Sequence, residues 1–289
     1  MTQKLLDLSG KVKDPILEIL EAISNIAASL NIPLFVVGAV ARDIILHYGY
    51  GVEIIRATGD IDLGVMVEDW DKFTQLKEAI IGSGTFDQGR EPQRFLYKGN
   101  FPIDMVPFGQ IAEPKDTIEW PEFEGIEMST LGFKESFDNS ILVRLRTDSN
   151  FEIKFASLAG LAAMKLISWK DKYPQRNKDA KDLKFIMLNY IEAGNFERIY
   201  DGEDSDILKD DAADYESMSA RLLGRDVTAI TTPESKEYIL KILNDETGEQ
   251  NHYKLALDMR QGSSYISDDF NANLNLLEAF KKGFLDKKI

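Results

Sequence analysis

The chain has 289 residues, which is enough for one large domain or two smaller ones. It carries 34 basic and 49 acidic residues, a net charge of −15, which argues against non-specific coating of nucleic acid. With no cysteine and two histidines, the sequence excludes disulfide scaffolds and thiolate sites and leaves little for imidazole chemistry. Its chemistry must therefore depend on carboxylates, lysines and arginines, and a carboxylate excess suits divalent cations.

The N-terminal segment does not look like a secretory signal, because Asp7 interrupts its apolar run. No apolar stretch approaches the ~18 residues of a membrane span. We therefore expect a cytoplasmic protein without a membrane partner.

The N-terminal half alternates predicted helices and strands. Apolar residues at three- and four-residue spacing predict helices over residues 15–30, 40–48 and 68–81. Short apolar or alternating runs predict strands over residues 34–37, 60–67, 94–97, 103–108, 141–146 and 151–155.

The pattern changes after residue 155 and becomes mainly helical, beginning with helices at 158–170 and 180–191. We therefore expect two domains, residues 1–155 and 156–289. The acidic stretch 197–216 is interpreted as a solvated surface rather than a functional site.

Three D-x-D pairs occur, and only the first lies in a strongly alternating apolar run. The pairs are Asp60 with Asp62, Asp69 with Asp71, and Asp204 with Asp206. In the first pair both carboxylates leave one face of a strand, where they can share divalent ions held ~3.5–4 Å apart. The second pair fits a helix N-terminus and the third a loop.

A third carboxylate is expected from a neighbouring strand, and Asp104 fits best. Apolar residues flank it, and an unpartnered charge is costly in such a setting. The alternative is an exposed aspartate on an edge strand, which Pro102 and Pro107 favour. The sequence leaves both interpretations open.

Gly38 joins a predicted strand directly to a helix, where free backbone N–H groups and the helix dipole suit a phosphate. The spacing matches neither the Rossmann nor the P-loop motif. Arg42, one turn further on, either reaches the phosphates or pairs with Asp43 or a sheet carboxylate.

Basic residues gather in one segment of this acidic chain. They are Lys165, Lys170, Lys172, Arg176, Lys178, Lys181 and Lys184. Such a segment can face a triphosphate or an RNA acceptor, or form solvated helix faces paired with neighbouring aspartates. Lys165 stands out because it interrupts an apolar stretch.

The segments VGAVARD (37–43) and TGDIDL (58–63) resemble the hG[GS]…DhDh signature of the polymerase-β-like nucleotidyltransferase superfamily. Within it, the chain is similar to bacterial predicted nucleotidyltransferases grouped with the AbiEii/AbiGii type IV toxins. The similarity continues through residues 103–109, 161–169 and 220–226.

The resemblance implies an α+β fold, with a mixed sheet flanked by helices, followed by the mainly helical C-terminal part. It also implies transfer of a nucleoside monophosphate from an NTP, such as ATP, to an acceptor, with release of pyrophosphate. Asp60 and Asp62 would hold two Mg²⁺ ions, or Mn²⁺, and Asp104 would complete the metal site and act as a base.

The resemblance also assigns nucleotide-binding residues. Gly38 and Ala39 would hold the phosphates through their backbone. Lys165 would neutralise the triphosphate, and Asp179 or Asp182 would orient that lysine or the nucleotide. Ala39 departs from the family's glycine or serine, and residues 49–58 look like an insertion.

The acceptor is not specified by the sequence: an RNA end, a protein hydroxyl or a small molecule all fit, and the toxin resemblance implies an antitoxin partner. One alternative function is a nucleotide-binding or toxin–antitoxin interaction protein with weak or lost catalysis. Another is a metal-dependent phosphohydrolase that uses the same carboxylates.

Overall fold

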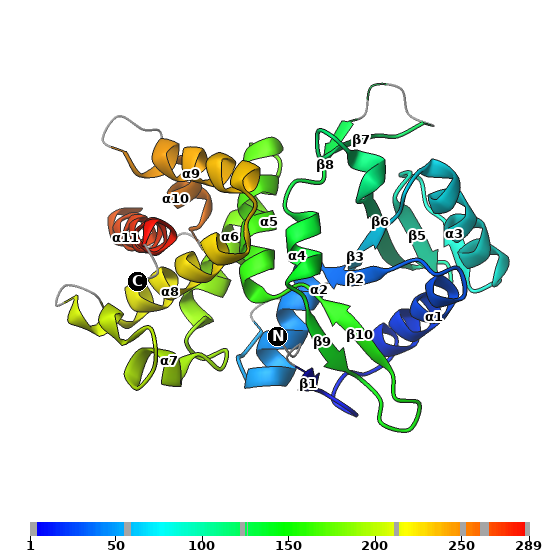
Figure 1. The fold of residues 1–289 in the computed structure, drawn as a ribbon, viewed down its shortest axis with the longest axis horizontal. Coiled ribbons are helices and arrows are strands. Elements are labelled where there is room, and N and C mark those ends of the chain that lie inside the picture. Colours follow the sequence, from blue (N-terminus) through cyan, green and yellow to red (C-terminus); the bar gives the residue numbers. More distant parts are fainter. Residues whose placement is uncertain are drawn as a thin grey trace. The chain divides into compact units, whose positions relative to one another are not determined.

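The computed structural model describes two compact units, one up to Ser157 and one from Leu158 (Figure 1). The described residues are 5–54, 59–121, 125, 127–210, 214–248, 253–260 and 266–286. Residues 55–58 of the expected 49–58 insertion therefore lie outside the described part. Among the described helices, none is both long and apolar enough to cross a membrane.

The first unit is built around a mixed sheet. Its strands are β1 (Leu5–Asp7), β2 (Leu34–Val37), β3 (Ile61–Met66), β4 (Phe86–Gln88), β5 (Arg94–Tyr97), β6 (Phe101–Phe108), β7 (Thr117–Glu119), β8 (Glu127–Ser129), β9 (Ile141–Arg144) and β10 (Glu152–Phe155). Within the described residues, eight of these form one sheet in the order β1-β9-β10-β2-β3-β6-β5-β4, and β7 pairs with β8.

Helices cover both faces of this sheet. They are α1 (Ile16–Ser29), α2 (Gly38–Asp43) with a π-helical continuation η1 (Ile44–Gly49), α3 (Trp70–Gly82), the 3₁₀ turn η2 (Gln110–Ala112) and α4 (Phe133–Asp138). The predicted mixed sheet flanked by helices is thus confirmed.

Strand alternation gives the two faces of β3 different roles. Ile61, Leu63 and Val65 are fully buried on one face. By the strand register, Tyr97 of β5 lies on the same face. Its hydroxyl donates a hydrogen bond to Glu18 of α1, so this is the face that α1 covers. Asp62 and Gly64 point to the other face. There the ring of Phe35 packs on residues of α4.

The bounds of most predicted elements agree with the structure within two or three residues. The predicted cap of α3 is also present, since Asp69 accepts a hydrogen bond from the backbone N–H of Lys72 at 2.8 Å. Helix α2 begins at Gly38, two residues earlier than its apolar spacing indicated. The short strands β1, β4, β7 and β8 and the helix α4 were not predicted, because segments of three to six residues give too little periodicity.

The second unit is helical throughout its described residues. Its helices are α5 (Leu158–Asp171), α6 (Asn177–Asn189), α7 (Phe196–Tyr200), the 3₁₀ segment η3 (Ser205–Lys209), α8 (Tyr215–Ile230), α9 (Pro233–Thr247), α10 (Lys254–Asp258) and α11 (Ile266–Leu285). Trp169 of α5 is 2% exposed and donates a hydrogen bond to Asp258 at 2.9 Å.

The acidic stretch 197–216 is not simply the solvated surface that we expected. Asp204 is 3% exposed and pairs with Arg198 at 2.8 Å and with Arg225 at 3.0 Å. Asp206, expected in a loop, lies in η3 and pairs with Arg225 at 2.5 Å. The two carboxylates therefore link η3 to α7 and α8 through ion pairs with arginines of those helices.

Gly64 tests the packing of the sheet on α4. A Cβ at this position would lie 2.2 Å from Cε1 of Phe35 and 3.2 Å from Cδ1 of Phe133. We expect Gly64→Ala to lower the free energy of unfolding by about 1–3 kcal/mol through overpacking, measured by urea denaturation. Gly82→Ala is the control, because a Cβ there meets nothing within 4 Å; equal stability of the two variants would contradict the packing argument.

Candidate active site

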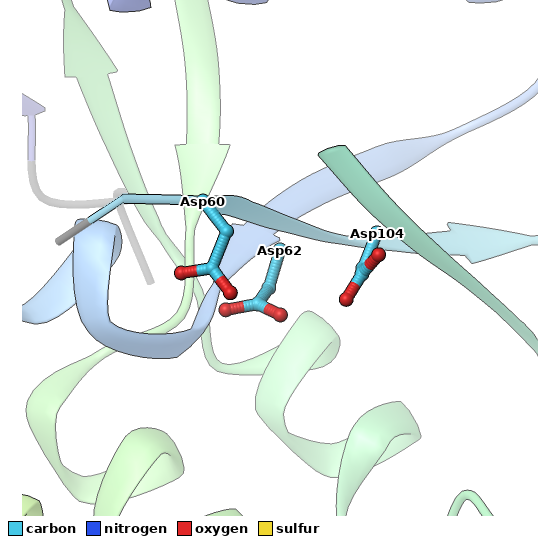
Figure 2. A group of neighbouring side chains, drawn as sticks. All are labelled: Asp60, Asp62 and Asp104. Carbon is cyan, nitrogen blue, oxygen red and sulfur yellow. The ribbon is translucent and has the colours of Figure 1, made fainter. Parts of the chain in front are cut away.

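Three aspartates from two adjacent strands meet on the α4 face of the sheet. Strands β3 and β6 pair in parallel with Asp62 opposite Asp104, and Asp60 directly precedes β3. Each of the three half-buried side chains offers a carboxylate oxygen, and these oxygens all lie within 4.8 Å of one another. Figure 2 shows the three carboxylates pointing to the same side of the strands.

The three carboxylates fit a divalent cation. Metal–oxygen bonds of 2.0–2.6 Å allow two ligand oxygens of one ion to lie up to about 5 Å apart, and the observed separations are within that limit. Carboxylate oxygens are also the ligands that Mg²⁺ and Mn²⁺ prefer. The residues predicted as metal ligands are therefore brought together.

The alternative interpretation of Asp104 as an edge-strand surface residue is wrong. Strand β6 lies between β3 and β5, and the Asp104 side chain is 15% exposed. Pro102 and Pro107, which favoured an edge position, lie in this interior strand.

Arg94 borders the site, and no sequence pattern predicted it there. Its position in β5 is directly opposite Asp104, and its Nε and Nη2 donate hydrogen bonds to the two Asp104 oxygens at 2.8 and 2.7 Å. The hydrogen bonds to Asp104 raise the pKa of Arg94, and the negative charge of Asp60 adds to this increase. The predicted strands 94–97 and 103–108 contain both residues, but the register between the strands was needed to find the contact.

Gly38 lies directly against the Asp62 carboxylate. Its φ is +70°, and a Cβ at this position would lie 2.0 Å from Oδ2 of Asp62. Only glycine satisfies both constraints. Helix α2 starts at this residue, and Ala39 follows half-buried in its first turn.

Arg42 forms the ion pair that the sequence left open as an alternative to phosphate binding. Its Nε donates to Oδ1 of Asp43 at 2.8 Å, and both residues are buried, at 7% and 6% exposure. The contacts favour a structural role for Arg42.

Lys165, Asp179 and Asp182 form a cluster of their own in the second unit. The Nζ of Lys165 lies 2.7 Å from Oδ1 of Asp179 and 2.7 Å from Oδ2 of Asp182. Burial alone would lower the pKa of Lys165, but the two carboxylates outweigh it and the pKa is raised. Asp179 is fully buried and also accepts a hydrogen bond from Arg176 at 2.8 Å.

No protein-family model and no curated protein matches the sequence. Solved structures with some likeness include ANT(2")-Ia in complex with adenylyl-2"-tobramycin, at 14% identity over 64% of this chain and 98% of that chain, with a TM-score of 0.38. A Thermotoga maritima CCA-adding enzyme complexed with tRNA has 12% identity over 97% of this chain and 81% of that chain, with a TM-score of 0.28.

A CCA-adding enzyme in complex with ATP has 15% identity over 96% of this chain and 80% of that chain, with a TM-score of 0.31. These neighbours are nucleotidyltransferases, the class that the sequence motif resembles. The narrower grouping with AbiEii/AbiGii toxins stays a prediction.

The contact of Gly38 with Asp62 predicts a change in metal affinity. We expect Gly38→Ala to displace the Asp62 carboxylate and to weaken Mn²⁺ binding about 10–100-fold, as loss of a residue that supports a ligand typically does. Calorimetric Mn²⁺ titration checks this.

Gly51→Ala is the matched control for that titration. Gly51 has a similar φ of +75°, but a Cβ there meets nothing within 4 Å. The same loss of Mn²⁺ affinity in both variants would mean that backbone strain, not contact with Asp62, is responsible.

The Lys165 cluster predicts a pH-dependent contribution to stability. Burial opposes ionisation of Asp179, but Lys165 and Arg176 outweigh it and lower its pKa below 3.8. A lowered carboxyl pKa stabilises the fold above the unfolded-state pKa, and this stabilisation is lost as the pH falls through the folded-state value.

We therefore expect Asp179→Asn to lower the free energy of unfolding by about 1–3 kcal/mol at neutral pH, because it removes one of the two carboxylates that pair with the buried Lys165 and the partner of Arg176. The difference from the wild type should shrink below about pH 3.8 in urea denaturation. Asp245→Asn, which removes the exposed partner of Lys170, should cost less than about 1 kcal/mol. A pH-independent difference for Asp179→Asn would contradict the assignment.

Proposed function

We propose that the protein is a metal-dependent nucleotidyltransferase. The observation that carries this proposal is the group of three carboxylates on β3 and β6, with oxygens within 4.8 Å of one another, against which the backbone of Gly38 packs. The nucleotidyltransferase-like sequence motif spans these same positions, Gly38, Asp60 and Asp62. The reaction joins a nucleoside monophosphate from an NTP to an acceptor and releases pyrophosphate.

Asp60, Asp62 and Asp104 would hold the divalent cations, which we propose to be two Mg²⁺ ions. Bound cations supply charge neutralisation for the triphosphate and lower the pKa of the acceptor hydroxyl. The hydroxyl oxygen forms a bond to the α-phosphorus as the bond between that phosphorus and the pyrophosphate oxygen breaks. Asp104 takes up the hydroxyl proton, so that it acts as the general base.

The nucleotide phosphates bind at the start of α2. The helix begins directly at Gly38, beside Asp62, and the backbone N–H groups of Gly38 and Ala39 donate to phosphate oxygens. Ala39 lacks a hydroxyl, so only its backbone takes part. The role of Lys165 as a counter-charge to the triphosphate, oriented by Asp179 or Asp182, stays a prediction from the sequence; within the second unit Lys165 contacts both carboxylates.

The biological setting belongs to the same proposal. A toxin of a toxin–antitoxin system, acting in the cytoplasm with an antitoxin protein as partner, agrees with the AbiEii-like sequence pattern. The acceptor is an RNA end, a protein hydroxyl or a small molecule.

The test follows each labelled NTP in a cell lysate and identifies the molecule that becomes labelled. The double variant Asp60→Asn with Asp62→Asn should lower transfer at least about a hundredfold, because stabilisation of developing charge is usually the largest catalytic contribution. Asp71→Asn, an exposed residue in the first turn of α3, should leave the rate unchanged.

Other outcomes would contradict transfer in specific ways. Undiminished labelling by the double variant would exclude the aspartates as the catalytic group. Release of inorganic phosphate instead of pyrophosphate would indicate a phosphohydrolase. Binding of Mg-NTP without turnover over a broad acceptor screen would indicate a nucleotide-binding interaction protein.

A further inference from the structure

Arg94 occupies both oxygens of the third carboxylate. The guanidinium donates two hydrogen bonds to Asp104, from Nε at 2.8 Å and from Nη2 at 2.7 Å. The same carboxylate offers an oxygen within 4.8 Å of the oxygens of Asp60 and Asp62. The Asp104 carboxylate therefore binds the Arg94 guanidinium and also faces the position where a divalent cation would bind.

The turn before β5 holds the backbone of Arg94 in place. The Arg94 carbonyl accepts hydrogen bonds from the backbone N–H of Gly89 at 2.8 Å and from Nε2 of Gln88 at 3.0 Å. Its own N–H donates to the carbonyl of Glu91 at 3.0 Å. The side chain is 32% exposed, so its position follows from this turn and from Asp104, not from burial.

An ionised carboxylate has about four acceptor positions, and a two-pronged arginine takes one on each oxygen. A cation arriving at Asp104 meets a carboxylate with fewer free positions and with its charge already balanced. Repulsion between the cation and the guanidinium adds to this.

We propose that Arg94 is a positioning residue that competes with the divalent cation for Asp104, so that Asp104 joins the metal site only as its bond to Arg94 loosens. This rests on the proposed metal site. Arg94 thus couples the loading of the metal site to the hydrogen bonding of Asp104.

The test is Mn²⁺ titration of the full chain by calorimetry, with no nucleotide and no activity readout. Arg94→Gln keeps a hydrogen-bond donor and removes the charge, so Mn²⁺ should bind about fivefold more tightly, as expected for one half-exposed charge pair. Arg94→Lys keeps the charge and should stay close to wild-type affinity. Arg146→Gln is the matched control, because Arg146 has similar exposure, 34%, and pairs with Glu21 in the same unit.

A double-variant cycle separates competition from a structural effect. In the Asp104→Asn background, Arg94→Gln should no longer change Mn²⁺ affinity. Two results would contradict the proposed competition. One is Mn²⁺ affinity in Arg94→Gln that is equal to or weaker than in the wild type. The other is an equal gain in Mn²⁺ affinity when Arg94→Gln is made in the Asp104→Asn background. Absence of Mn²⁺ binding by the wild type would overturn this inference together with the metal site, whereas Mn²⁺ binding without nucleotidyl transfer would contradict only the proposed function.

Discussion

The parallel pairing of β3 with β6 is the constraint on which the candidate site depends. Ile61 and Leu63 of β3 are fully buried and fix which face of that strand turns toward α1. Because side chains alternate, a slip of one residue would carry Asp62 to the buried face. The register with β6 then sets Asp104 beside Asp62, so the core that stabilises the sheet also positions the carboxylates.

Arginine contacts organise the acidic charge of this chain in both units. In the first unit Arg94 binds Asp104 through two hydrogen bonds. In the second, Arg225 binds Asp206 and Asp286 at 2.5 and 2.7 Å. Arg forms such forked contacts because its donors lie in one plane. The net charge of −15 therefore hides a set of specific local pairings.

The sequence predicted what depends on local periodicity. Asp60 and Asp62 could be singled out because their run alternates strictly, and the main strands followed from similar patterns. Asp104 lies in an interior strand of the sheet because of the strand order, and the local sequence around Asp104 does not determine that order. Arg94 was missed because its partner lies across a hairpin, and the acidic stretch 197–216 was misjudged because Arg225 comes from a later helix.

The cluster around Lys165 has a consequence for how far its charge is felt. Lys165 and Arg176 stand against Asp179 and Asp182 at 2.7 to 2.8 Å, so the group carries no net charge. The field of such a group falls off faster than that of a free ammonium. Lys165 therefore gives little long-range steering to an approaching anion, and any dependence of the on-rate on ionic strength at this helix pair comes from its exposed lysines, such as Lys178 and Lys181.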